Sequence, residues 1–156
     1  MRFAFIAALL LAFGCVSAYD ETYAKETEML EQAEQKRQAE EAAAHAEARK
    51  YAAVVYFDVN SAEIKDAREL DWFVKQMQPY PQAIIQVQGF ADSTGTESLN
   101  QELSEQRAAS VAQYLGSAGI DPAQIRTEGF ASQYAARPNV NAQGRQRNRR
   151  VEVTVR

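Results

Sequence analysis

The sequence is poor in the residues that most often perform catalysis or bind transition metals. Its single cysteine, Cys15, excludes a disulfide within the chain, and its single histidine, His45, has no second histidine or cysteine close to it. There is neither a glycine loop that could cradle a phosphate nor a paired nucleophile and base. We therefore expect a protein that is not an enzyme and that needs no metal or other cofactor.

A long apolar run and a net positive charge are also missing. The apolar segment Phe3–Phe13 follows Arg2 and is too short to cross a bilayer comfortably, which is the layout of an export signal over residues 1–18. Because of this signal, the mature protein is expected to leave the cytoplasm. The net charge of −4 argues against nucleic acid as a partner.

Two processing sites overlap where this run ends. Ala12-Phe13-Gly14-Cys15 is similar to a lipobox, whose cysteine becomes the lipid-modified first residue, although Ala12 and Phe13 fit that pattern poorly. Val16-Ser17-Ala18 suits ordinary signal peptidase, which would discard Cys15 and leave a soluble periplasmic protein. The place of the cysteine, directly after a glycine at the end of the run, favours lipid attachment at Cys15.

Residues 19–50 contain no glycine or proline and are rich in Ala, Glu and Gln, a composition that favours helix. The larger apolar residues Tyr19, Tyr23, Met29 and Leu30 make no sustained heptad seam. We interpret the segment as a solvated helical spacer, with His45 as one of its surface residues.

Residues 51–156 show the periodicities of one α+β domain. Short β-forming runs occur at 54–57, 85–89, 125–130 and 151–155. Helical spacing predicts a first long helix, whose buried stripe is Ile64, Ala67, Leu70, Val74 and Met77, with Trp72 and Phe73 at its flanks. It predicts a second long helix with the stripe Leu99, Leu103, Val111 and Leu115. A short helix is expected near 141–147. The order β-α-β-α-β-(α)-β predicts a two-layer sandwich with helices packed on one face of a mixed four-stranded sheet. Asn60, three residues before Glu63, has the spacing of a helix N-cap.

An acid and a base stand out within this domain. Asp92 follows the strand at 85–89, and Arg107 lies in the next helix, on a face shared with Asn100 and Ser104 beside the apolar stripe. The two side chains could hold the ammonium and the carboxylate of a free amino-acid centre. They could equally neutralise each other in a structural ion pair.

Over roughly residues 53–155 the chain resembles the OmpA-like peptidoglycan-binding domain. The resemblance rests on the order and spacing of Val55-Tyr56-Phe57-Asp58-Val59-Asn60-Ser61, Gly89-Phe90-Ala91-Asp92-Ser93-Thr94-Gly95, Asn100, Leu103-Ser104, Arg107-Ala108, Val111, Gly129-Phe130, Gly144-Arg145 and Asn148-Arg149-Arg150-Val151-Glu152.

The resemblance implies roles for particular residues. Asp92 and Arg107 would hold the diaminopimelate of the peptidoglycan stem peptide, and Asn60 and Asn100 would line the same pocket. Where members of that family more often carry His-Thr or Tyr-Thr before the aspartate, this chain has Phe90-Ala91. A hydroxyl is therefore lost, whereas a backbone contact at Ala91 would survive. The arginines between Arg137 and Arg156 would mainly brace loops and the last strand.

The function implied is a non-catalytic tether between the outer membrane and the cell wall. Its partners would be peptidoglycan, the outer membrane through a lipid at Cys15, and other envelope proteins. The alternative is a protein-interaction module of the envelope with a weakened pocket, which the change at Phe90-Ala91 makes worth testing.

Lipid attachment predicts that cells expressing the full chain incorporate radiolabelled palmitate into it. Cys15→Ala should abolish the label, because the thiol is the acceptor. Equal labelling of the two proteins would contradict attachment at Cys15.

Overall fold

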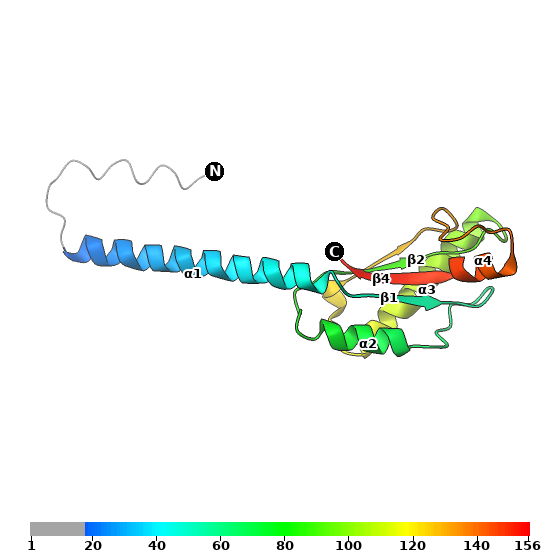
Figure 1. Ribbon diagram of the computed structural model, residues 1–156, viewed down its shortest axis with the longest axis horizontal. Helices are drawn as coiled ribbons and strands as arrows, with labels where there is room; N and C mark the ends of the chain where they lie inside the picture. The colour runs from blue at the N-terminus through cyan, green and yellow to red at the C-terminus, as the bar shows by residue number, and fades with distance from the viewer. Residues whose placement is uncertain (1–17) are drawn as a thin grey trace. The chain divides into compact units, whose positions relative to one another are not determined.

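The computed structural model describes residues 18–156, which divide after Ala42 into two compact units (Figure 1). The predicted export signal, residues 1–18, therefore lies outside the described residues except for its last residue, Ala18. Cys15 also lies outside them. The helix α1 spans Ala18–Ala48, and its side chains are exposed from Tyr23 to Ala44. Among residues 18–156, no helix is both long and apolar enough to cross a bilayer.

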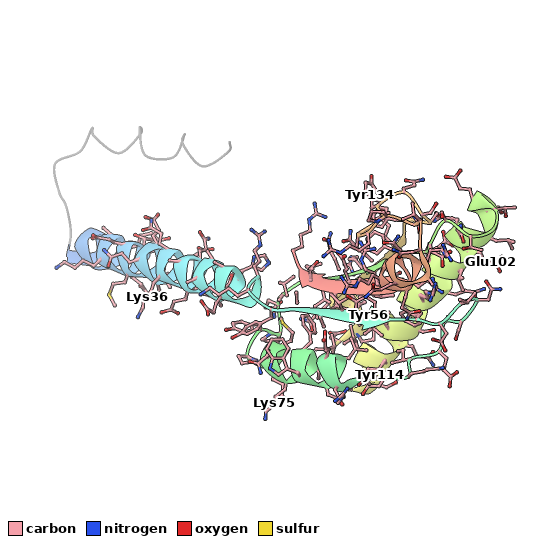
Figure 2. The ribbon with its side chains drawn as sticks, turned by 45° about the vertical axis from the view of Figure 1, so that its right-hand side comes forward. Lys36, Tyr56, Lys75, Glu102, Tyr114 and Tyr134 are labelled. Carbon is pink, nitrogen blue, oxygen red and sulfur yellow. The ribbon has the colours of Figure 1, made fainter. Side chains whose placement is uncertain are left out.

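Pairs of opposite charge follow one another along α1. Lys36 lies 3.8 Å from Glu40, and Arg37 lies 3.8 Å from both Glu34 and Glu41. Lys36 points outward from the helix (Figure 2). Each of these exposed pairs contributes only about 0.3–0.5 kcal/mol, so the helical composition itself is the main reason that this segment is helical.

Residues 43–156 form the α+β domain that the sequence predicts. Its strands are β1 (Ala52–Tyr56), β2 (Ile85–Gly89), β3 (Ile125–Gly129) and β4 (Arg150–Val155), in the order β1-β4-β2-β3. Strand β4 is antiparallel to β1 and β2, and β2 is parallel to β3. The helices are α2 (Arg68–Met77), α3 (Glu97–Ser117) and α4 (Ala142–Asn148), with a short 3-10 turn η1 (Pro122–Gln124).

The core lies between one face of this sheet and the helices α2 and α3 (Figure 1). Alternate strand residues such as Val55, Val87 and Val153 point into it, because successive side chains of a strand face opposite ways. Every buried apolar residue of the described chain lies between Ala48 and Val155. A chain that begins at Ala18 therefore keeps every buried apolar residue that the structure describes.

The buried face of α3 differs from the expected leucine stripe. Leu99 is 60% exposed, whereas Asn100, Ser104 and Arg107 are almost completely buried. These polar residues lie on the buried face itself, not beside it, and the face continues through Ala108, Val111 and Leu115. The first turns of α3 cover polar strand-end loops, and only its later turns cover the apolar sheet.

Glycine at position 89 allows α3 to approach the sheet closely. A Cβ atom there would lie 2.0 Å from the backbone oxygen of Ser104. The Ser104 hydroxyl accepts from the Ala131 amide at 3.1 Å and donates to the Gln101 carbonyl at 2.8 Å. The close approach thus couples α3 to the loops at the ends of β2 and β3.

The predicted helix cap at Asn60 is wrong. Helix α2 begins only at Arg68, and Asn60 lies in a turn with φ of 52°. The intervening residues make local turn contacts, such as the Glu63 amide donating to the Ser61 hydroxyl at 3.1 Å. Phe73 belongs to the core, whereas Trp72 is 48% exposed.

Gly89→Ala should destabilise the domain by roughly 1–3 kcal/mol, because the added methyl group forces α3 away from β2. Gly116→Ala is the control: its nearest neighbour would be 3.9 Å away, and alanine is the better helix former, so it should be neutral or stabilising. Urea unfolding midpoints measure both, and equal midpoints would contradict the close-packing argument.

Candidate ligand cavity

A small cavity lies where the loops after β1 and β2 meet α3 and the start of β4. All five residues that the sequence analysis predicts as the binding site line this cavity: Asn60, Ala91, Asp92, Asn100 and Arg107. The remaining lining residues are Val59, Thr94, Leu103 and Arg149. Its volume is about 10 Å³, which has room for about one water molecule. A larger ligand group therefore requires the rim of the cavity to open.

Arg107 is fully buried and is held by backbone carbonyl groups from two loops. Its Nε donates to Ser61 at 2.9 Å, Nη1 to Phe90 at 3.1 Å and Nη2 to Asp58 at 2.9 Å. Its guanidinium lies 5.4 Å from the centre of the Phe57 ring. A guanidinium carries five N–H groups, so two remain for a ligand.

Burial lowers the pKa of Arg107 to about 10, and the positive charge of Arg149 adds to this effect, while Asp92 opposes it. A pKa of about 10 leaves the group charged at neutral pH. The side chain therefore offers the cavity a fixed positive charge.

Asp92 pairs with Arg149, not with Arg107. Its Oδ2 accepts from Nη1 of Arg149 at 2.7 Å, and both side chains are more than nine-tenths buried. The sequence allowed a structural ion pair between Asp92 and Arg107. The structure instead pairs Asp92 with Arg149, another residue of the cavity wall. Arg149 also donates from Nε to the Phe57 carbonyl at 3.1 Å and contacts the side-chain oxygen of Gln146.

Sequence reasoning counted Arg149 only among the arginines that brace the structure. Its position between a polar segment and the alternating strand 151–155 marks a strand start, but not which way the side chain points. Its contact with Asp92 crosses fifty-seven positions of sequence, so local periodicity carries no signal for it.

Burial raises the pKa of Asp92, but hydrogen bonds from Arg149 and from the backbone and side chain of Thr94 outweigh this, and the pKa lies below its usual range. The Thr94 amide donates to Oδ1 at 2.8 Å. Asp92 is therefore ionised at neutral pH, and its oxygens retain lone pairs for a further donor.

The other predicted residues take different parts in the cavity. Asn60 lies on the exposed rim, and Asn100 is buried in the first turn of α3. The Ala91 amide donates to Ala131 at 2.7 Å. A backbone contact at Ala91 would therefore have to use its carbonyl oxygen.

Asn148 fixes the long loop beside this cavity. Its side chain exchanges two hydrogen bonds with the backbone of Arg137, at 2.9 and 2.7 Å, and donates to the side chain of Asn139 at 2.9 Å. Asn139 in turn accepts from the Ser93 amide at 3.2 Å. The loop after β2 is thus braced from the C-terminal segment.

The cavity has the chemistry of a binding site for an amphoteric group. Two buried guanidinium groups, of Arg107 and Arg149, face one buried carboxylate, Asp92. This surplus of positive charge favours a ligand carboxylate, and Asp92 can accept from an ammonium beside it. Among the side chains that the structure describes, those of residues 23–156, no cluster of His, Cys, Asp and Glu has an arrangement that could hold a metal ion.

The model of the OmpA family matches residues 56–149, which include all the cavity residues. The chain belongs to the OmpA family. It is 41% identical over 103 residues to the probable lipoprotein YiaD of Escherichia coli, covering 65% of this chain and 47% of that protein. It is 43% identical over 102 residues to outer membrane protein A of Bordetella avium, covering 64% and 53%.

The fold is shared with a solved structure. The crystal structure of the peptidoglycan-associated lipoprotein from Burkholderia pseudomallei superposes with a TM-score of 0.64 at 25% identity, over 67% of this chain and 90% of that one. The chain spans about half the length of the two curated relatives named above.

The lowered pKa of Asp92 gives a pH-dependent stability. Because the folded pKa lies below the unfolded value of about 3.9, the ion pair stabilises the fold above that pH, and this contribution is lost as the pH falls through the folded pKa. Asp92→Asn should lower the free energy of unfolding near neutral pH by roughly 3 kcal/mol, since it leaves Arg149 buried without its carboxylate.

Asp92→Asn should also flatten the fall in stability below about pH 4. Urea unfolding across this range measures both effects, with Glu128→Gln, an exposed carboxylate on β3, as the control. An unchanged pH slope in Asp92→Asn would show that the pair does not control acid stability.

Proposed function

We propose that this OmpA-family chain is a non-catalytic tether that binds peptidoglycan and links the outer membrane to the cell wall. The observation that carries the proposal is the meeting of Asp92 and Arg107 in one cavity, with two N–H groups of the buried guanidinium unused. The names of the relatives support it: they are a peptidoglycan-associated lipoprotein, a probable lipoprotein and an outer membrane protein.

The ligand group proposed is the free amino-acid centre of diaminopimelate in an uncrosslinked stem peptide. Its carboxylate would accept from the two remaining N–H groups of Arg107, and its ammonium would donate to Asp92. Asn100 and the carbonyl of Ala91 would complete the contacts from the cavity wall, and Asn60 from the rim.

Charge favours the carboxylate as the more important half of this ligand. The cavity already holds two cations and one anion, so a ligand that lacked its carboxylate would add a positive charge to a positive site. Loss of the ligand ammonium would remove a cation from beside Asp92, whose charge Arg149 already pairs. The site should therefore distinguish ligands mainly by whether they carry the carboxylate.

The closed state of the cavity implies weak binding of a single stem peptide. Opening the rim costs free energy, which reduces the affinity of each site. Many copies of the protein on one polymer would recover strength through multivalency. A reversible tether follows.

The membrane end of this tether is proposed to be a lipid at Cys15, with the helical segment as spacer. The 31 residues of α1 would extend roughly 46 Å at 1.5 Å per residue. The same proposal includes contacts with other envelope proteins. It gives no site residue a catalytic role.

The test uses residues 18–156 and two soluble tripeptides, L-Ala-γ-D-Glu-meso-diaminopimelate and its L-lysine counterpart, which lacks only the terminal carboxylate. Isothermal titration should detect the first and give at least tenfold weaker binding for the second, about 1.4 kcal/mol, because the Arg107 contact is lost. Equal affinities would overturn the diaminopimelate assignment.

Co-sedimentation with purified sacculi tests the tether itself. Asp92→Asn, checked for folding by circular dichroism, should lose binding, and Glu128→Gln should keep it. Arg107→Ala is less suited, because its side chain holds three backbone carbonyls together. Absence of sedimentation by the parent protein would favour the protein-interaction alternative.

A further inference from the structure

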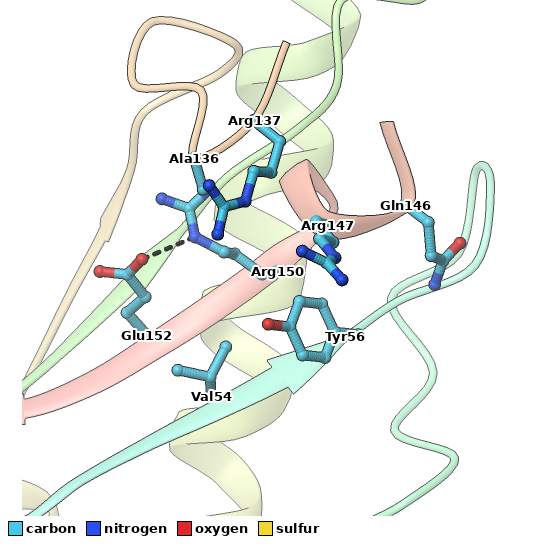
Figure 3. Close-up of a pocket in the computed structure, with 8 residues that line it drawn as sticks. All are labelled: Val54, Tyr56, Ala136, Arg137, Gln146, Arg147, Arg150 and Glu152. Carbon is cyan, nitrogen blue, oxygen red and sulfur yellow. Dashed lines mark hydrogen bonds and ion pairs between the residues drawn. The ribbon is translucent and has the colours of Figure 1, made fainter. Parts of the chain in front are cut away.

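A second cleft, which we call the arginine cleft, lies on the sheet face away from α2 and α3 (Figure 3). Its volume is about 660 Å³, within the range of small-molecule sites. It shares no residue with the cavity of Asp92 and Arg107. It is lined by Val54, Tyr56, Ala136, Arg137, Gln146, Arg147, Arg150 and Glu152.

Strand register explains why the two sites face different ways. Tyr56 pairs with Arg150 and Val54 with Glu152 across β1 and β4, so these four side chains share the outer face. Arg149 and Arg150 are neighbours in sequence, but Arg149 turns to Asp92 and Arg150 to the arginine cleft. One sequence motif therefore supplies both sites.

The arginine cleft has more positive than negative charge. Glu152 is its one carboxylate, and it already accepts from Nε of Arg150 at 2.6 Å. Arg137 and Arg147 have exposed side chains, and no ion pair found among the described side chains, those of residues 23–156, involves either of them. The surplus amounts to two guanidinium groups.

Arg150 has a buried donor without a partner. The residue is 6% exposed, its guanidinium lies 4.0 Å from the centre of the Phe90 ring, and Nη2 donates to Tyr134 at 3.3 Å. Nη1 is buried and has no hydrogen-bond partner in the described chain. A charged N–H that is desolvated and unpaired is unfavourable, and a ligand oxygen reached by a small movement would remove that penalty.

We propose that the arginine cleft binds a phosphate monoester. A dianion matches the surplus of two positive charges, whereas a carboxylate would neutralise only one of them. Arginine side chains suit phosphate because their planar forks donate to two oxygens at once. In Figure 3 the side chains of Arg137, Arg147 and Arg150 border the same opening, with the Tyr56 hydroxyl as a further donor.

The first experiment titrates residues 18–156 with inorganic phosphate at about pH 7.5, where the dianion predominates, and follows amide NMR shifts against sodium chloride of equal ionic strength. Saturable shifts are expected at Tyr56, Arg150 and Glu152. Arg137→Gln and Arg147→Gln, which change only exposed side chains, should each weaken binding at least fivefold. Arg156→Gln, an exposed arginine outside the cleft, should leave it unchanged.

Two further ligands distinguish the source of the phosphate. Binding of glycerol 3-phosphate but not of vesicles would indicate a soluble phosphate ester. Co-sedimentation with phosphatidic acid and phosphatidylcholine vesicles, lost in Arg147→Gln and absent for phosphatidylcholine alone, would indicate a lipid headgroup. Residues 18–156 are used because they lack the apolar run Phe3–Phe13, which could itself bind to vesicles.

Shifts that do not saturate, that chloride reproduces, or that Arg137→Gln and Arg147→Gln leave unchanged would overturn the proposal. The Asp92→Asn variant separates this site from the proposed peptidoglycan site. It should lose sacculus binding and still bind phosphate.

Discussion

The buried guanidinium of Arg107 connects the parts of this domain that form the candidate ligand cavity. Its three hydrogen bonds end on carbonyls of Asp58, Ser61 and Phe90, so one side chain on α3 fixes both strand-end loops. Backbone carbonyls carry only partial charges, and the nearest full negative charge among the cavity residues, Asp92, is engaged by Arg149. The arrangement leaves a charged group buried with hydrogen-bonding capacity unused, which marks a candidate binding site.

The junction of α4 and β4 organises the second half of the molecule. Asn148 holds the long loop, Arg149 lines the cavity of Asp92 and Arg107, and Arg150 lines the arginine cleft. The Arg150 guanidinium also lies over the ring of Phe90. Three consecutive polar residues are thus nearly buried, each in a different environment. The change from helix to strand achieves this. Asn148 ends α4, Arg149 is the C-cap of that helix and Arg150 begins β4, so their side chains leave the backbone in different directions.

Local pattern was sufficient for much of the fold. Alternation at 85–89 and 151–155 and helical spacing in the two long helices predicted the α+β sandwich, since period and length are properties of short segments. It failed at Asn60, whose spacing to Glu63 is that of a cap although the chain continues in turns to Arg68. It also placed Leu99 in the core, because the stripe rule treats every helix turn as packing on apolar surface.

The sequence by itself determined the element order and five of the residues around the cavity, Asn60, Ala91, Asp92, Asn100 and Arg107, because these depend on neighbours along the chain and on the family motifs. Only the tertiary structure decided the partners. The pairing of Asp92 with Arg149, the carbonyl ligands of Arg107 and the unpaired Nη1 of Arg150 depend on how loops distant in sequence meet. Hydrogen bonds and ion pairs are short-ranged, so they are fixed by distances that no local period encodes.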